Sequence, residues 1–225
     1  MKIIENEQLL VWNKKSGIPV FPKHNDPSHP CVLFEVKEYA PYLNEINVDR
    51  FECGIAHRLD IPTSGAIYIA KNINYLNIIR SLFTSKQLLK TYYFLSSQSK
   101  TNRISCDLPI GHHPNNKRKM LVKKNKTYRC RGKWYPAQTS FQFVGQRGGQ
   151  YLYRATMRSG IMHQIRVHAS FCGLSLDGDS LYGSNQPSPI QTGFALHHWG
   201  MEHAELPKLE NCLPENWPEW THQLT

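Results

Sequence analysis

The chain has 225 residues, a formal net charge of +10 at neutral pH and a pI near 9.3. Its hydrophobic fraction of 40% and its 25 aromatic residues (five Trp, eleven Tyr and nine Phe) exclude a disordered chain. No repeat, low-complexity linker or compositional break divides the sequence, so we expect a single domain over residues 1–225. The positive charge favours a polyanionic partner, because Lys and Arg that neutralise phosphates release counterions.

The distribution of cysteine and histidine indicates neither disulfides nor a metal. The six cysteines form no CxxC pair and no signal peptide precedes them, which predicts reduced thiols in a cytoplasmic protein. The eleven histidines lack HExxH or Cys/His ligand spacing, and there is no GxGxxG or GxxxxGK loop. Long apolar stretches are also missing. We therefore expect no metal, no cofactor and no membrane, and the sequence gives no sign of an obligatory protein partner.

The expected elements follow one another along the whole chain. LLVWN predicts a strand that leads into a Gly/Pro turn, and Ser28 is expected to cap a short helix through about Tyr39. AIYIA predicts a buried strand, so the polar RLDIPTS before it must be a connection and HRLD must lie on a loop. Later helices are predicted over 73–84 and 162–172, and later strands at about 91–97, 103–109, 118–124, 136–144, 151–158 and 194–201.

The order and spacing of these elements determine the fold class. Several neighbouring strands have short connections, which favours antiparallel pairing, and the helices do not alternate with strands in βαβ units. The sequence therefore predicts an α+β fold with a mixed, mostly antiparallel sheet flanked by a few helices and long loops.

Asp60 has two interpretations on the residues alone. Pro62 stiffens the connection that presents its carboxylate, which suits a fixed reactive group. An Asp before PTSG is also typical of a turn capped through Thr63 or Ser64. The local sequence by itself favours the turn.

The densest run of positive charge extends from Lys117 to Lys133 and is interleaved with Tyr128 and Trp134. A solvated hairpin and a surface that follows phosphates are both compatible with this pattern.

Four segments together resemble the RluA-like pseudouridine synthases. HRLDIPTSGAIYIAK resembles the family's HRLD loop, TSG turn and strand ending in AK. KTYYFLS resembles its K-x-Y strand, DLPIGHHPNNKRKMLV its LPI segment with basic residues, and HQIRVHASFCGLSLDGDSLYG its HQIRVH helix and GDxLYG turn. The opening LLVWNKKSGIPVFP and the closing FALHHWGMEH extend the resemblance over about residues 3–218.

This resemblance implies the pseudouridine synthase catalytic fold and an isomerase that acts on uridine in structured RNA, either tRNA or rRNA. Asp60 matches the essential carboxylate, Tyr92 the tyrosine of the second motif and Arg166 the basic residue of the third. Asp60 would attack the anomeric carbon or remove the proton on carbon 2', and the sequence leaves both routes open. Arg166 would orient Asp60, while Tyr92 would stack on the uracil and assist loss of the carbon-5 proton.

The resemblance also implies a set of residues that contact RNA. A base inside structured RNA must leave its stack before it can react, and Arg58 is the candidate for insertion into the RNA. His57, Thr63, Lys90, His163 and Gln164 complete the predicted RNA-binding set, with structural hydrogen bonding as the alternative for the two histidines, the lysine and the glutamine. Asp177 and Asp179 are expected to stabilise the GDxLYG turn rather than to bind a metal.

The chain departs from the family pattern at three positions. Relatives usually carry a basic residue where Ile61 stands, and Ile161 and Met162 replace the arginine and threonine of TGRTHQIRVH. An RNA contact is therefore expected to differ. The match also indicates a short form of the family, without the N-terminal RNA-binding module, in which the basic run helps to recognise the target.

Two other functions are also compatible with the sequence. One is a catalytically weak or inactive synthase-like protein that binds RNA. The other is a hydrolase that uses the carboxylate and histidines on a sugar bond or a phosphate, which release of free uracil or inhibition by a chelator would reveal.

Overall fold

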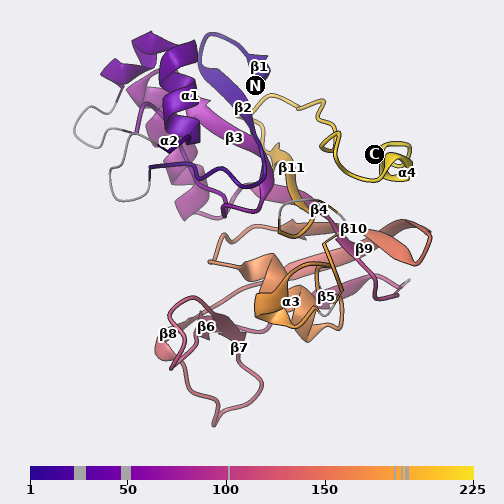
Figure 1. Cartoon of the computed structure of the whole chain (residues 1–225). Helices are drawn as coiled ribbons and strands as arrows, with labels where there is room; N and C mark the ends of the chain where they lie inside the picture. The colour runs from indigo at the N-terminus through magenta and orange to yellow at the C-terminus, as the bar shows by residue number, and fades with distance from the viewer. Residues whose placement is uncertain (23–28, 47–51, 101, 185, 189, 191–192) are drawn as a thin grey trace.

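The computed structural model describes residues 1–22, 29–46, 52–100, 102–184, 186–188, 190 and 193–225. Within these residues the main sheet has eight strands in the order β1-β2-β3-β11-β4-β10-β9-β5 (Figure 1). These strands are β1 (Lys2–Glu5), β2 (Leu9–Lys14), β3 (Ser64–Ala70), β4 (Leu89–Ser96), β5 (Ile104–Cys106), β9 (Thr139–Arg147), β10 (Gln150–Met157) and β11 (Leu196–Glu202). Only the β3–β11 pair is parallel among the strand pairs described. The predicted α+β class with a mixed, mostly antiparallel sheet is confirmed.

A small second sheet has the order β7-β6-β8, and short helices complete the described fold. Its strands are β6 (Ile110–His112), β7 (Met120–Val122) and β8 (Arg131–Tyr135). The helices are α1 (Val32–Tyr39), η2 (Pro41–Glu45), α2 (Ile73–Thr84), α3 (Gln164–Phe171), η4 (Ser180–Tyr182) and α4 (Glu219–His222). In the part of the chain that is described, no helix has both the length and the apolar composition needed to cross a membrane.

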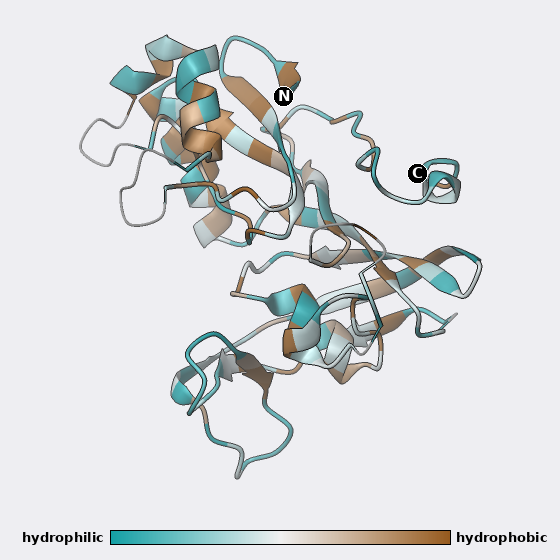
Figure 2. Ribbon diagram, in the orientation of Figure 1, coloured by the Kyte–Doolittle hydropathy of each residue, from teal (hydrophilic) through white to brown (hydrophobic). Residues whose placement is uncertain are grey.

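The N-terminal half of the sheet carries most of the apolar core. β3 is buried along its whole length, and β2 is buried at all but one position, so both strands read as nearly continuous apolar runs. The same strands are brown in Figure 2. α2 packs against β3 and covers the predicted residues 73–84, with Asn72 accepting the amide of Tyr75 at its N-terminus.

The first helix differs from its predicted start. It begins at Val32, with Cys31 in the capping position, whereas Ser28 lies outside the described residues. The amides of Val32 and Leu33 donate to the carbonyl oxygens of Pro19 and Val20. The preceding backbone thus satisfies the first turn, so no side-chain cap is required there.

α3 is an unusual helix because its polar residues are buried. Gln164, Arg166 and His168 lie below one tenth exposed, and buried polar groups of this kind need partners. The helix starts at Gln164, two residues later than predicted, because His163 has a left-handed backbone with φ 56°. It packs against β7 and β9, which places it between the main sheet and the small one.

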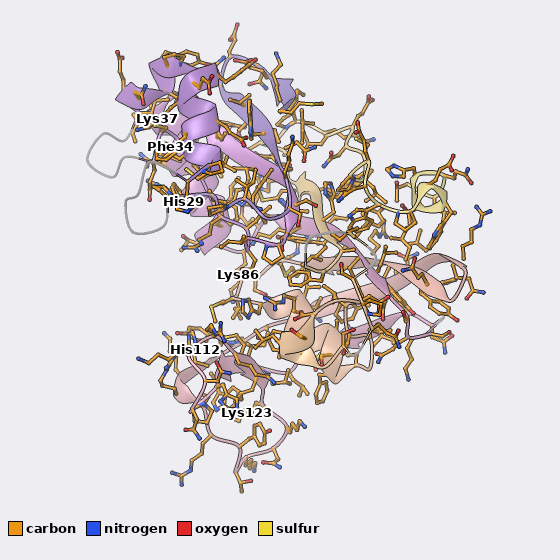
Figure 3. The ribbon with its side chains drawn as sticks, viewed as in Figure 1. His29, Phe34, Lys37, Lys86, His112 and Lys123 are labelled. Carbon is orange, nitrogen blue, oxygen red and sulfur yellow. The ribbon has the colours of Figure 1, made fainter. Side chains whose placement is uncertain are left out.

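We call residues 110–135, which contain the second sheet and its connections, the basic lobe. Figure 3 marks this lobe by His112 and Lys123, at the end of the molecule opposite α1 and α2. The sequence did not predict β6 or β8. The basic run is not a hairpin, because β7 and β8 pair with opposite edges of β6 and not with each other. β6 is a three-residue strand, so the sequence contained little signal for it.

The parallel contact between β3 and β11 depends on Gly65. Its φ is +116°, and a Cβ placed there would lie 2.2 Å from the carbonyl oxygen of His198. Only glycine lets the two backbones approach this closely. This pairing brings the loop before β3 next to β11 and β4.

We predict that Gly65→Ala lowers the stability of the fold by more than about 3 kcal/mol, because the new methyl group meets backbone that cannot move aside. Thermal unfolding followed by circular dichroism measures the effect. Gly149→Ala is the matched control, since φ is +79° there but nothing lies within 4 Å of the added atom. The control should cost only about 1–2 kcal/mol, and equal losses in both variants would refute the close-approach explanation.

Candidate active site

A cavity of about 790 Å³ lies where the loop before β3, strand β4, the start of α3 and strand β11 meet. Every residue that the sequence assigned to the site lines it: His57, Arg58, Asp60, Thr63, Lys90, Tyr92, His163, Gln164 and Arg166. The departures from the family pattern, Ile61, Ile161 and Met162, line it as well. The predicted residues, which span 109 positions from His57 to Arg166, thus lie together in one cavity.

The loop that carries Asp60 is held by hydrogen bonds from a buried lysine. Lys14, at the end of β2, donates to the carbonyl oxygens of Ile61 at 2.9 Å and Thr63 at 2.6 Å. Burial lowers the pKa of Lys14 to about 8, against the attraction of Asp60. This lysine was not predicted from the sequence. The one feature of the sequence that pointed to Lys14 was its position as a charged residue at the end of a mostly apolar strand.

The carboxylate of Asp60 points away from its own turn. The turn closes through the backbone, with the amide of Thr63 donating to the carbonyl oxygen of Asp60 at 3.0 Å. The carboxylate instead lies 3.4 Å from Nη1 of Arg166 and 3.6 Å from Nε2 of His163. The side-chain cap that the local sequence favoured is thus wrong.

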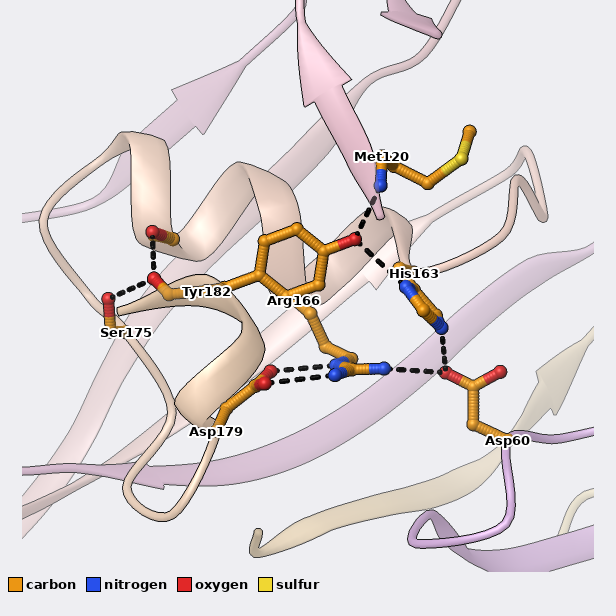
Figure 4. A network of polar contacts seen from close by, with 8 residues as sticks. Asp60, Met120, His163, Arg166, Ser175, Asp179 and Tyr182 are labelled. Carbon is orange, nitrogen blue, oxygen red and sulfur yellow. Dashed lines mark hydrogen bonds and ion pairs between the residues drawn. The ribbon is translucent and has the colours of Figure 1, made fainter. Parts of the chain in front are cut away.

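Arg166 is held in place by Asp179. Its Nε and Nη2 donate to the two carboxylate oxygens of Asp179 at 2.7 and 2.9 Å, while Nη1 faces Asp60 (Figure 4). Two parallel bonds of this kind fix the plane of a guanidinium. The backbone of Asp179 closes the predicted turn by accepting the amide of Tyr182. Its side chain has a second role that the turn motif did not indicate.

His163 and Gln164 have different surroundings although they are adjacent. His163 lies between Asp60 and the hydroxyl of Tyr182, which is 2.8 Å from Nδ1. Burial lowers the pKa of His163, and the charge of Asp60 opposes this shift. Gln164 accepts from the Ser159 hydroxyl and donates to the carbonyl oxygen of Gln138 and the hydroxyl of Thr139, so its amide joins the segment before α3 to the start of β9.

Tyr92 belongs to a cluster of rings in which His198 contacts both Tyr92 and His57. It is 7% exposed, and its ring centroid lies 4.6 Å from that of His198. Burial raises the pKa of Tyr92, and the nearby charge of Asp60 raises it further. His198 donates from Nδ1 to the carbonyl oxygen of Ala66, and His57 accepts the amide of Tyr68. The sequence assigned no role of its own to His198, which lies in the closing FALHHWGMEH segment.

The side chains of Lys90 and Arg58 differ in burial, and so in whether their charges can contact a ligand. Lys90 donates to the carbonyl oxygens of Arg158 and Ser159 at 3.2 and 3.1 Å, and burial lowers its pKa to about 8. It therefore holds the segment before α3, the structural role that the sequence had left open. Arg58 is exposed at the edge of the cavity.

The arrangement suits a reaction in which a carboxylate attacks a carbon atom, or removes a proton, next to a bound planar ring. A carboxylate stands next to one guanidinium, and an aromatic ring forms part of a mostly apolar wall. Such a carboxylate can attack an electrophilic carbon or accept a proton. Among the described residues, no three His, Cys, Asp or Glu side chains are grouped so that they could hold a metal ion.

The basic lobe stands beside the cavity with its charges outward. Lys123, Lys124 and Lys133 lie over the rings of Trp134, Tyr128 and Tyr135 at 5.8, 6.0 and 5.3 Å. The lobe thus presents cations and exposed aromatic surface together, a combination that binds nucleic acids.

Comparison with known proteins agrees with this geometry. Ribosomal large subunit pseudouridine synthase D of Nitrosomonas europaea is 30% identical over 209 residues, covering 89% of this chain and 56% of that protein. An uncharacterized RNA pseudouridine synthase of Helicobacter pylori is 33% identical, covering 94% of this chain and 64% of the relative. The chain thus spans about half to two thirds of the length of these relatives.

Solved structures show the same fold at lower identity. Human RNA pseudouridylate synthase domain containing 4 superposes with a TM-score of 0.70 at 20% identity, covering 95% of this chain and 88% of that one. Human RNA pseudouridylate synthase domain containing 1 gives a TM-score of 0.69 at 20% identity, with coverages of 89% and 76%. The sequence profile of the RNA pseudouridylate synthase family matches residues 8–171. The chain belongs to the RNA pseudouridylate synthase family, and its sequence relatives support membership of the RluA-like group.

Proposed function

We propose that this protein is an RNA pseudouridine synthase in which Asp60 is the reactive carboxylate. The observation that carries the proposal is the position of Asp60, which shares one cavity with Tyr92 and faces Arg166 at 3.4 Å. The reaction breaks the bond from uracil nitrogen 1 to the sugar and joins carbon 5 to the same sugar carbon. Nitrogen 1 gains a proton and carbon 5 loses one, so the atoms balance without a redox partner or group donor.

The roles of the three central residues follow from their surroundings. Asp60 either attacks the anomeric carbon or removes the carbon-2' proton, and Arg166, fixed by Asp179, orients it for either route. Tyr92 offers its ring to the uracil. Since burial raises the pKa of Tyr92, its hydroxyl is protonated at neutral pH. It can therefore take the carbon-5 proton only while passing its own to Asp60 or to water.

The proposed substrate is structured RNA, tRNA or rRNA, which meets the protein at two places. Arg58 at the cavity edge enters the space left by the flipped base. The exposed cations of the basic lobe contact phosphates. His57, Thr63, Lys90, His163 and Gln164 shape the cavity around the flipped nucleotide. A single catalytic domain over residues 1–225 stays a prediction, and we propose the cytoplasm, where these RNAs occur, as its compartment.

The enzyme proposal predicts that Asp60→Asn lowers the rate of pseudouridine formation by at least about 10²–10⁴-fold while RNA binding is retained, because the amide can neither attack nor take a proton. Purified protein is incubated with uridine-containing tRNA and rRNA transcripts, and pseudouridine is measured by mass spectrometry.

Two results would contradict the proposal. If the parent protein forms no pseudouridine yet binds these RNAs as tightly as Asp60→Asn does, the chain is an RNA-binding protein. If free uracil is released, it is a hydrolase.

If the exposed cations of the basic lobe contact RNA phosphates, RNA binding should depend less on salt in the double variant Lys124→Ala with Lys126→Ala. Each phosphate contact adds about 0.7–0.9 to the slope of log affinity against log salt, so the loss of two contacts should lower the slope by about 1.4–1.8. The matched control removes Arg147 and Lys208, which are exposed elsewhere. An equal fall in both double variants would show that the lobe contributes only its share of the net charge.

A further inference from the structure

A series of polar contacts joins the basic lobe to Asp60. The amide of Met120, on β7, donates to the hydroxyl oxygen of Tyr182 at 2.9 Å. That hydroxyl lies 2.8 Å from Nδ1 of His163, and Nε2 of His163 lies 3.6 Å from Asp60 (Figure 4). Tyr182 has no part in the chemistry described so far.

Only one position of the hydroxyl hydrogen of Tyr182 gives that hydrogen an acceptor. Burial raises the pKa of Tyr182, so the phenol keeps its proton at neutral pH. Its oxygen already accepts the Met120 amide. Among the described residues, Nδ1 of His163 is the one remaining polar partner of this hydroxyl. The phenol must therefore donate to Nδ1, or its hydrogen is buried without an acceptor.

This bond determines which nitrogen of His163 carries the proton. Burial lowers the pKa of His163, against the opposing charges of Asp60 and Asp179 and with the help of Arg166, so the ring is neutral near pH 7. A neutral imidazole has one N–H. With Nδ1 accepting from Tyr182, that N–H is on Nε2, which faces Asp60. The opposite tautomer would turn a lone pair toward the carboxylate.

The surrounding structure fixes both rings. His163 has φ 56° and ψ 21°, a left-handed conformation that is uncommon for residues with a side chain and marks an enforced geometry. Two cations lie close to the ring of Tyr182, with the guanidinium carbon of Arg166 at 5.0 Å and Nζ of Lys119 at 5.7 Å from its centroid.

We propose that Tyr182 is a positioning residue that holds His163 as the Nε2–H tautomer, so that His163 gives Asp60 an uncharged donor beside Arg166. The inference rests on the proposed function for the role of Asp60. The contact of 3.6 Å is longer than a hydrogen bond, and catalytic contacts of this kind shorten when substrate binds. Because Met120 belongs to the basic lobe, the same contacts tie the position of β7 to the orientation of Asp60.

The tautomer is measured first, without any activity assay. Long-range ¹H–¹⁵N NMR of the full chain at pH 7 distinguishes the two nitrogens of a neutral histidine, and His163→Gln assigns the signal. We expect a protonated Nε2 in the parent protein and a mixture of tautomers in Tyr182→Phe. A protonated Nδ1, or a doubly protonated ring, in the parent protein would overturn the proposal.

The kinetic test uses a double-mutant cycle. Tyr182→Phe keeps the ring and should lower kcat about fivefold with KM nearly unchanged, the size expected for losing one oriented hydrogen bond. In a His163→Gln background the side-chain amide is an N–H donor in either case, so Tyr182→Phe should then change kcat less than twofold. Independent, multiplicative losses in the two backgrounds would contradict the proposal.

Tyr153→Phe is the matched control for losing a buried hydroxyl. Tyr153 also accepts a backbone amide, from Lys100, and donates to a carbonyl oxygen, of Gln98, but both partners lie away from the cavity. This variant should leave kcat within about twofold of the parent value; a fivefold loss there would mean that the effect at Tyr182 is not specific. If the parent protein shows the expected tautomer but makes no pseudouridine, the proposed function fails while the tautomer assignment stands.

Discussion

Arg166 is a buried cation, and the need to compensate its charge organises the candidate site. Its side chain is 8% exposed, and that of Asp179, which binds two of its nitrogens, is 2% exposed. A buried charge without a partner lowers the stability of the folded state by several kcal/mol. The attraction within a buried ion pair offsets this cost only when the two groups are well aligned. Once Asp179 has occupied Nε and Nη2, the remaining Nη1 is directed at Asp60. The ion pair thus directs the one remaining guanidinium nitrogen toward the carboxylate of Asp60.

The rest of the fold brings other groups to that ion pair. Gly65 lets β11 lie against β3, and β11 in turn places His198 beneath Tyr92 of β4. Lys14 holds the loop of Asp60 by donating to the carbonyl oxygens of Ile61 and Thr63. Each contact joins segments that are distant in sequence. The cavity therefore depends on the tertiary fold as a whole, and one well-formed element would not produce it.

How much of this could be predicted from the sequence depends on where each signal lay. α2 and β3 were predicted because their patterns are local and strongly periodic or apolar. Asp60, Tyr92 and Arg166 were selected through motifs, and they do line one cavity. The partnership of Asp179 with Arg166 was missed, because a turn motif says nothing about where a carboxylate points. Lys14 was missed because lysine is ordinarily exposed.

In the proposed reaction Asp60, oriented by Arg166, acts on the sugar of a uridine whose base rests on Tyr92. A crystal structure of the protein bound to an RNA with 5-fluorouridine at a modified position tests it most directly. We expect the fluorinated base against the ring of Tyr92, with a carboxylate oxygen of Asp60 within about 3.5 Å of carbon 1' or carbon 2' of that sugar, or bonded to it. A base bound outside the cavity, or Asp60 turned away from the sugar, would contradict it.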